Sequence, residues 1–189
     1  EVLWTVLPIL ILVVIAVPSF RLLYFQRVIP EADLTIKAVG YQWYWGYEYP
    51  DHGDFAFDSL MLSDAERGSQ PRLLATDTAM VVPVGKTVRV VVTGADVLHA
   101  FAMPAFGLKI DAVPGRLNET WFKAEKTGTY YGQCSELCGI RHAFMPIRIE
   151  VVEPEVFANW VSDAQEEYAA LEGSKTKLAA DNVNISSIR

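Results

Sequence analysis

The stretch that carries most of the chemistry in this chain is Cys134-Ser135-Glu136-Leu137-Cys138-Gly139-Ile140-Arg141-His142-Ala143-Phe144-Met145. It holds both cysteines of the chain, one of its three histidines and one of its four methionines. His99 lies upstream, within an apolar run that has the pattern of a strand. Thiolate, imidazole and thioether groups together are ligands of copper, with a weak Met ligand typical of electron-transfer sites. This stretch therefore predicts a copper site.

The number of cysteines separates two kinds of copper site. A mononuclear blue-copper site uses one Cys, two His and a weak axial Met, whereas this chain offers two Cys. Two thiolates can instead bridge two copper ions, with one histidine and one weaker ligand completing each ion. Cys134, Cys138 and His142 are spaced four apart and Met145 follows three later, so a short loop can present all four inward.

Two other interpretations of the cysteine pair stay open on the residues alone. A Cys134–Cys138 disulfide would close a very short loop and would leave the clustering of His and Met unexplained. A zinc site with two Cys and two His is the second, although Met is not among the usual zinc ligands. The motif is not C-x-x-C-H, so no covalently attached haem is indicated.

The motif at residues 132–139, followed by His142 and Met145, resembles the binuclear copper (CuA) loop of cytochrome c oxidase subunit II. Three further stretches resemble signatures of the same family, namely residues 41–49, 96–99 and 107–118. The resemblance covers about residues 1–160 and implies a cupredoxin-like fold. It also implies the function of an oxidase subunit in proton-pumping respiration, which accepts electrons from cytochrome c and passes them to haem in subunit I.

The resemblance also implies roles for single residues. The implied ligands of the copper pair are His99, Cys134, Glu136 through its backbone carbonyl, Cys138, His142 and Met145. The Glu136 carboxylate is implied to reach a magnesium ion shared with subunit I, which suits the preference of magnesium for oxygen ligands. Trp43 is implied to be the residue that receives electrons from cytochrome c. Subunits I and III are the expected oxidase partners.

The N-terminal residues predict a transmembrane helix. The segment 2–20 carries no charged side chain, and at 1.5 Å per residue it spans roughly 28 Å, close to the thickness of a bilayer's hydrocarbon core. We expect the helix to extend to about Gln26, with Pro8 and Pro18 tolerated as they are in membrane helices. A signal peptide is disfavoured because the segment starts with Glu1 and lacks a small-residue cleavage site.

The resemblance divides the chain into a transmembrane helix at 1–27, a copper domain at 28–153, and a C-terminal helix and tail at 154–189. The family has two membrane helices, so we expect this helix to be the second, with the first absent from the chain. Arg21 and Arg27 alone would place the domain in the cytoplasm, but the resemblance places it outside. We expect a bacterial plasma membrane with a periplasmic domain, or alternatively a mitochondrial inner membrane with the domain in the intermembrane space.

Charge indicates the kind of partner. The net charge is −7, which disfavours nucleic acid and favours a basic protein partner. Five carboxylates near the aromatic stretch match positions where the family docks cytochrome c, namely Glu48, Asp51, Asp54, Asp58 and Asp96. A solvated acidic loop is the ordinary alternative. Glu1 matches the family's glutamate at the mouth of a proton-uptake path, and an interfacial carboxylate in water is the alternative there.

Short β-rich runs follow the membrane segment and predict a mainly β, Greek-key barrel or sandwich. A period-two pattern begins at Leu34, and five aromatic residues are expected on one strand face with Tyr44 opposite: Tyr41, Trp43, Trp45, Tyr47 and Tyr49. The other expected strands are at 72–75, 79–83, 86–93, 97–103, 117–123, 129–133 and 146–152. Pro154 predicts the start of a packing helix, and a polar tail follows Gly173.

The alternative function is a membrane-tethered copper-binding or copper-carrier protein, which would not need the aromatic stretch or the motif at 111–118. A quinol oxidase subunit would keep the fold but lack the copper ligands, which are all present here. The copper domain of nitrous oxide reductase shares the loop but should not carry the membrane helix.

Overall fold

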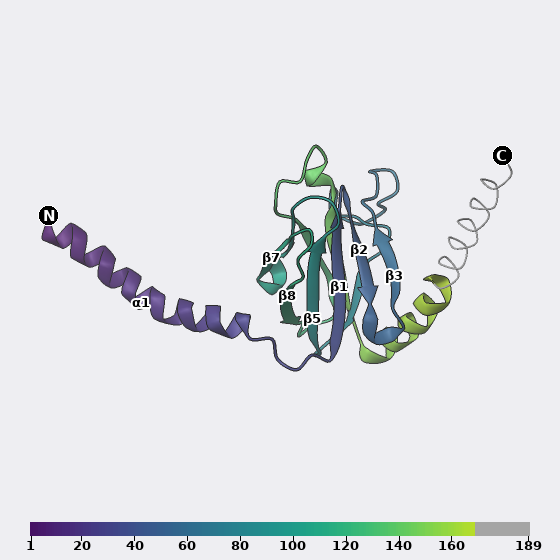
Figure 1. Ribbon diagram of the computed structural model, residues 1–189, viewed down its shortest axis with the longest axis horizontal. Coiled ribbons are helices and arrows are strands. Elements are labelled where there is room, and N and C mark those ends of the chain that lie inside the picture. The colour runs from purple at the N-terminus through teal and green to yellow at the C-terminus, as the bar shows by residue number, and fades with distance from the viewer. Residues whose placement is uncertain (169–189) are drawn as a thin grey trace. The chain divides into compact units, whose positions relative to one another are not determined.

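The computed structural model describes residues 1–168, which form two compact units, residues 1–31 and the domain that begins at Ala32 (Figure 1). In the first unit, helix α1 (Val2–Arg27) is apolar on all sides and buries none of its residues within the chain. It is long and apolar enough to cross a membrane. The predicted transmembrane helix is therefore present, with both Pro8 and Pro18 inside it.

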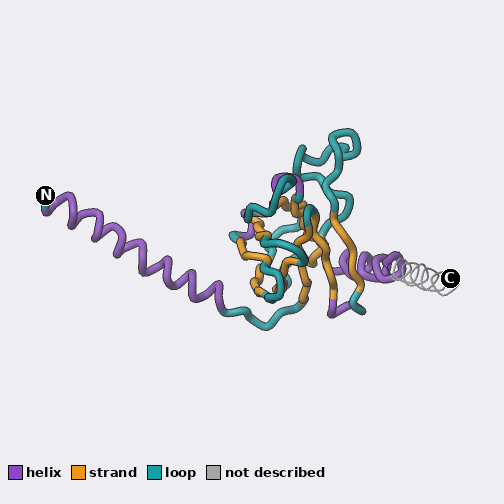
Figure 2. The backbone as a smooth tube through the Cα atoms, turned by 45° about the horizontal axis from the view of Figure 1, so that its top comes forward, coloured by secondary structure: helices purple, strands orange, loops and turns teal. Residues whose placement is uncertain are grey.

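The second unit is a sandwich of two five-stranded sheets (Figures 1 and 2). One sheet has the order β3-β2-β1-β5-β8, with β1 (Leu34–Tyr41), β2 (Tyr44–Tyr49), β3 (Phe55–Ser59), β5 (Thr87–Gly94) and β8 (Asn118–Lys123). The other has the order β4-β10-β9-β6-β7, with β4 (Met80–Pro83), β6 (His99–Met103), β7 (Leu108–Ala112), β9 (Gly128–Cys134) and β10 (Pro146–Val152). Three 3-10 turns are η1 (Pro50–His52), η2 (Pro104–Phe106) and η3 (His142–Phe144).

The two sheets pack face to face and bury side chains between them, alternate ones in strands such as β3 and β5 and every one in β4 and β6. In β5, Val88, Val90 and Val92 are fully buried while their neighbours are half-buried. The layers meet where the Trp45 ring packs edge-on against Phe101, with ring centres 5.4 Å apart. Pairing is antiparallel except between β1 and β5 and between β4 and β10. The predicted mainly β, cupredoxin-like sandwich is confirmed.

The predicted aromatic stripe is not a single strand, and this expectation was wrong. β1 ends at Tyr41 and β2 begins at Tyr44, so Gln42 and Trp43 form the turn between two antiparallel strands. Tyr41 and Tyr44 are register partners and stack with ring centres 4.7 Å apart. The turn carries neither Gly nor Pro, so no residue there signals a chain reversal. The fully buried residues of the stripe are Trp45, Tyr47 and Tyr49.

Three other strand assignments also needed correction. Residues 72–75 were expected to be a strand but lie in turns, where Leu73 has φ 67°. β3 was missed because Asp54 before it and Asp58 within it suggested a solvated loop, although Phe55, Phe57 and Ser59 alternate as buried residues. β7 was missed because Lys109 and Asp111 interrupt its apolar pattern on the exposed face.

The expected C-terminal helix is present over residues 154–168 and closes one side of the sandwich. Phe157 and Val161 are buried, and the Trp160 ring lies 5.2 Å from that of Tyr49. The Tyr168 ring stacks on Phe57 at 4.9 Å. This is the packing role that its apolar spacing predicted. The polar tail expected after Gly173 lies outside the described residues.

Candidate metal centre

The candidate ligands come from the strand ends at one end of the sandwich. His99 is the first residue of β6 and Cys134 is the last residue of β9. β6 and β9 are neighbours, with Phe101 paired to Cys134, so the two side chains lie close together. The loop from residue 135 to Met145 connects β9 to β10. Its backbone is held by hydrogen bonds from Ser135 N to Ala100 O (3.0 Å) and from Cys134 N to Met145 O (3.4 Å).

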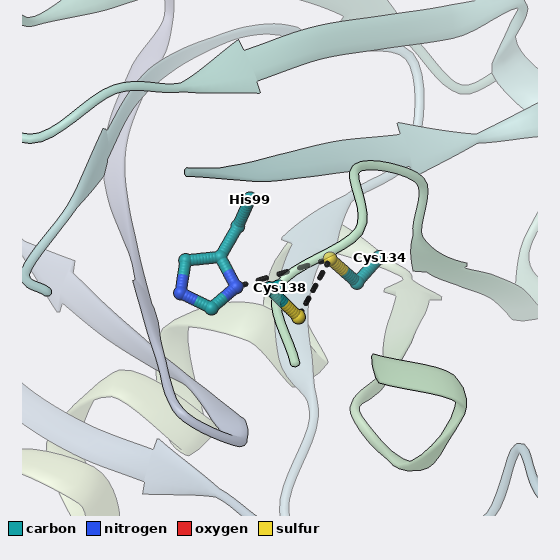
Figure 3. Close-up of side chains that lie close together, drawn as sticks. All are labelled: His99, Cys134 and Cys138. Atoms are coloured by element: carbon teal, nitrogen blue, oxygen red, sulfur yellow. Dashed lines mark hydrogen bonds between the residues drawn. The ribbon is translucent and has the colours of Figure 1, made fainter. Parts of the chain in front are cut away.

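The two cysteine sulfurs form the centre of the site. Their Sγ atoms lie 3.8 Å apart, and both cysteines are free and buried. Figure 3 shows His99 Nδ1 directed at Cys134 Sγ, at 3.9 Å. On the other side, His142 Nδ1 lies 3.5 Å from Cys138 Sγ. The arrangement is therefore two adjacent sulfurs with one imidazole on each.

A weaker donor accompanies each sulfur. Met145 Sδ lies 3.5 Å from Cys138 Sγ, and the Glu136 backbone carbonyl lies 3.4 Å from Cys134 Sγ. Six donors thus gather from His99 and one loop. His99, Cys134 and Cys138 present ligand atoms within 4.8 Å of one another. A soft donor set of two thiolates, two imidazoles and a thioether fits copper. A single tetrahedral zinc would leave the thioether and the carbonyl unused.

A carboxylate orients the buried histidine. Asp96 Oδ1 lies 2.9 Å from His99 Nε2, and a carboxylate there favours the tautomer whose Nδ1 is free to bind metal. Burial acts to lower the pKa of His99, but its contacts with Cys134 and Asp96 outweigh burial and raise that pKa. The ring is fully enclosed, and a Cβ on Gly40 would lie only 2.8 Å from His99 Cδ2.

The two thiols differ in acidity in the metal-free protein. Burial opposes ionisation of Cys134, but hydrogen bonding from His99 lowers its pKa. Burial and the negative charge on Cys134 raise the pKa of Cys138. One sulfur is therefore the thiolate and the other keeps its proton. A metal that binds both must displace that proton, which couples metal binding to proton release.

The turn between β1 and β2 lies directly on the loop. The Trp43 indole Nε1–H donates to the Cys138 carbonyl at 3.2 Å, and the Gln42 side-chain amide donates to the same oxygen at 2.8 Å. Gly139 has φ +123°, and a Cβ there would lie 2.9 Å from Trp43 Cζ2. Trp43, identified from the sequence, is thus in contact with the backbone of a candidate ligand. Gln42 and Gly139 were missed because neither carries a group that signals a metal site.

Three of the five predicted docking carboxylates surround Tyr41. Partial burial and the negative charges of Asp58, Glu48 and Asp96 raise the pKa of Tyr41. Glu48 pairs with Lys37 across β1 and β2, at 2.9 Å. The Asp96 carboxylate also accepts hydrogen bonds from the backbone N–H groups of Gln42 (2.7 Å) and Val97 (2.6 Å).

The other two docking carboxylates lie away from the metal loop. Asp51 Oδ2 accepts a hydrogen bond from Thr35 N at the start of β1, whereas the loop lies beyond the end of β1. Asp54 follows in the same connection between β2 and β3. Glu1 is exposed at the beginning of α1, and the Glu136 side chain is exposed on the loop. The five acids therefore do not form one cluster.

Comparison with known proteins identifies related sequences across both units. The family described as cytochrome c oxidase subunit II, periplasmic domain, matches residues 34–152, and its transmembrane domain matches residues 1–22. A probable cytochrome c oxidase subunit 2 from Rickettsia bellii is 60% identical over 182 residues, covering 96% of this chain and 67% of the relative. The subunit 2 of Branchiostoma floridae is 54% identical, covering 85% and 70%. Three further Rickettsia relatives are matched over only 56–57% of their length.

Two solved structures resemble the sandwich. The periplasmic domain of subunit II of cytochrome oxidase from Bradyrhizobium japonicum has a TM-score of 0.71 and 67% identity, covering 75% of this chain and 99% of that domain. A mixed disulfide between a thioredoxin-like protein and subunit II of cytochrome c oxidase has a TM-score of 0.66 and 66% identity, covering 75% and 97%.

Proposed function

The chain belongs to the cytochrome c oxidase subunit II family, and from this premise we propose that it accepts electrons from cytochrome c at a pair of copper ions and passes them to haem in subunit I. It is a membrane-anchored oxidase subunit, and oxygen reduction itself takes place in subunit I. One observation carries the proposal: Cys138 supplies a sulfur to the candidate metal site and its carbonyl to the Trp43 indole.

The ligands we propose for the copper pair are His99, Cys134, Glu136 by its carbonyl, Cys138, His142 and Met145. When bound, such a pair supplies a one-electron redox couple. The chain's own contribution is to hold the ligands still. His99 and Cys134 are fixed by adjacent strands, and the loop is fixed by backbone hydrogen bonds at both of its ends. A fixed ligand set changes little between oxidation states, which favours fast electron transfer.

Trp43 is the proposed route from the surface to this site. Its ring is half-buried against Gly139, and its indole N–H reaches the Cys138 carbonyl. A donor haem placed against the exposed part of the ring would therefore be connected to a ligand residue by one hydrogen bond. This arrangement keeps the sulfurs themselves away from water, since both cysteines are buried.

We place the docking of cytochrome c around Tyr41, where Glu48, Asp58 and Asp96 lie. Asp51 and Asp54 extend the negative charge toward the other end of β1. Such a surface steers a basic protein, and the association rate falls as salt screens it.

Further assignments follow from the same family premise. We propose that the exposed Glu136 carboxylate contributes to a magnesium site with subunit I, that subunit III completes the assembly, and that Glu1 lies at the mouth of a proton-uptake path. The copper domain would face the periplasm of a bacterial plasma membrane or, alternatively, the mitochondrial intermembrane space. Copper binds the two cysteines only as thiols, so a disulfide between Cys134 and Cys138 would first have to be reduced. A thioredoxin-like dithiol can reduce such a disulfide and becomes a disulfide itself, and a relative forms a mixed disulfide with such a protein.

The test is to load residues 32–189 with copper, count the ions, and record the electron paramagnetic resonance spectrum. A relative of this domain was crystallised without its membrane segment, which supports its use alone. We expect two copper ions sharing one unpaired electron. A Cys138→Ser variant should lose that signal. One copper per chain with a mononuclear spectrum, or a preference for zinc, would instead favour a membrane-tethered copper carrier.

A further inference from the structure

The Cys138 carbonyl accepts hydrogen bonds from two consecutive side chains. Gln42 Nε2 donates at 2.8 Å and Trp43 Nε1 donates at 3.2 Å. A carbonyl oxygen has two lone pairs, so these two donors satisfy it completely. The bond from Gln42 is the shorter one, although Gln42 carries neither a charge nor an aromatic ring. Its amide therefore takes part in fixing the contact that joins Trp43 to the loop.

Gln42 is also anchored at its backbone. Its N–H donates to Asp96 Oδ2 at 2.7 Å, and the other oxygen of the same carboxylate lies 2.9 Å from His99 Nε2. The backbone anchor does not depend on which side chain occupies position 42. A substitution there can therefore remove the bond to Cys138 while leaving the Asp96 and His99 contacts in place.

The turn between β1 and β2 packs closely against the loop, with no room for a side chain at Gly139. A Cβ on Gly139 would lie 2.9 Å from Trp43 Cζ2 and 3.2 Å from Gln42 Nε2. The turn therefore packs directly against the backbone of Gly139, which has no side chain of its own to hold the Cys138–Gly139 peptide group in place. The two donors from the turn set the orientation of that peptide group.

We propose that Gln42 is a positioning residue for electron transfer, which holds the Cys138 carbonyl in the orientation that the Trp43 indole requires. This inference rests on the proposed function, in which Trp43 is the route to the copper site. Gln42 itself is not a proposed ligand, and it carries no charge that would steer cytochrome c. Its loss should affect the transfer step and leave the association with cytochrome c unchanged.

The experiment compares Gln42→Met, Gln42→Glu and Trp43→Phe in the copper-loaded domain, residues 32–189. Met keeps the length of the side chain without a donor, and Glu keeps the shape but offers only acceptors at neutral pH. Gln133→Met, at an exposed position on β9, is the matched control. Stopped-flow mixing with reduced cytochrome c gives the limiting electron-transfer rate and the half-saturating concentration. The copper spectrum is recorded for each variant.

We expect Gln42→Met to lower the limiting rate by about tenfold, within the range found when partners of a metal ligand are removed. The half-saturating concentration and the thermal midpoint should stay at their wild-type values. Gln42→Glu should lower the rate similarly, while its added charge tightens docking. In the metal-free domain, hydrogen exchange of the Trp43 indole proton should become faster in Gln42→Met, which is a readout independent of copper.

The outcomes separate this inference from the function on which it rests. If Gln42→Met keeps the wild-type limiting rate and indole exchange while Trp43→Phe is slow, the positioning role is overturned and the route through Trp43 stands. If Trp43→Phe also keeps the wild-type rate, the proposed route itself fails. An equal loss of rate in Gln133→Met would show a general effect of substitution and would equally overturn the role of Gln42.

Discussion

Gly40 shows how a residue without a side chain can determine a metal site. A Cβ at this position would lie 2.8 Å from His99 Cδ2 and 2.9 Å from Cγ, closer than real contacts allow. Its φ is not in the left-handed region, so the requirement for glycine is one of space. The His99 side chain therefore packs directly against the backbone of Gly40 near the end of β1, while Asp96 holds its Nε2.

We predict that Gly40→Ala displaces the His99 ring and costs about 1–3 kcal/mol of stability, as overpacking of a core does. Copper binding should weaken and the spectrum of the bound copper should change. Chemical denaturation and copper titration of residues 32–189 check this. Gly85→Ala is the control: Gly85 has φ +74° but no atom within 4 Å of its Cβ position. It should lose stability through backbone strain alone and keep the copper spectrum. Wild-type copper affinity in Gly40→Ala would contradict the packing argument.

The acidic surface belongs to the β1–β2–β3 layer. Glu48 and Asp58 stand on neighbouring strands and act on Tyr41 together with Asp96. Asp96 differs from the other two because one of its partners is the candidate ligand His99, in addition to the backbone N–H groups of Gln42 and Val97. A substitution at Asp58 therefore tests docking more directly than one at Asp96, because Asp96 also orients the candidate ligand His99.

We predict that Asp58→Asn raises the half-saturating concentration for cytochrome c and flattens its dependence on salt, because one attractive charge is lost. The limiting electron-transfer rate should not change. Asp51→Asn, at the other end of β1, is the comparison and should shift docking less. Stopped-flow measurements over a range of salt concentrations decide between the two positions. A larger effect from Asp51 would move the docking centre away from Trp43.

The described part of the C-terminal helix, residues 154–168, stabilises the sandwich through contacts at β2 and β3. Trp160 contacts Tyr49, Phe55 and Phe57, all on β2 and β3. The helix is also held by a hydrogen bond from Gln165 Nε2 to the His52 carbonyl, beyond the end of β2 that lies away from the loop.

We predict that Trp160→Ala lowers the free energy of unfolding by about 2–4 kcal/mol, slightly less than for a fully buried aromatic residue. The copper spectrum should be unchanged, because the contacts that are lost lie on β2 and β3, away from the metal loop. Thermal and urea denaturation measure the first effect. Val156→Ala, at an exposed position of the same helix, should change stability very little. A changed copper spectrum in Trp160→Ala would show coupling along the sandwich.

The candidate metal ligands come from segments of the domain that lie far apart in the sequence. His99 comes from β6, and the other candidate ligands come from the end of β9 and the loop that leads into β10. A metal bound to all of them links segments that are 35 residues apart in sequence, as Cys134 and His99 are. Any ligand that binds only the folded state stabilises that state by mass action.

We predict that copper raises the thermal midpoint of residues 32–189, with a gain of about 2.7 kcal/mol when free copper is one hundred times its dissociation constant. A chelator should reverse the gain. Calorimetry of the metal-free and loaded domain measures it. Cys138→Ser should gain much less, because it loses one of the two sulfurs at the centre of the site. An equal gain in that variant would place the stabilising copper elsewhere.

The membrane helix, the strand-rich domain, the C-terminal helix and the chemistry of the ligand loop could all be predicted from the amino-acid sequence. These features depend on local pattern: an unbroken apolar run, alternation of buried valines, and two Cys, a His and a Met within one short loop. Family resemblance, rather than pattern, supplied the role of Trp43.

The contacts between distant segments, in contrast, became visible only in the folded domain. The turn at Gln42 and Trp43 was hidden because neither residue is a usual turn former, and its contact with Cys138 joins positions about 95 residues apart. The need for glycine at Gly40 and Gly139 arises from rings that approach from other segments. Asp51 and Asp58 are close in sequence, yet β3 reverses the chain and leaves them at different heights along the sheet. Such proximities follow from strand pairing across the whole sandwich, which local sequence does not specify.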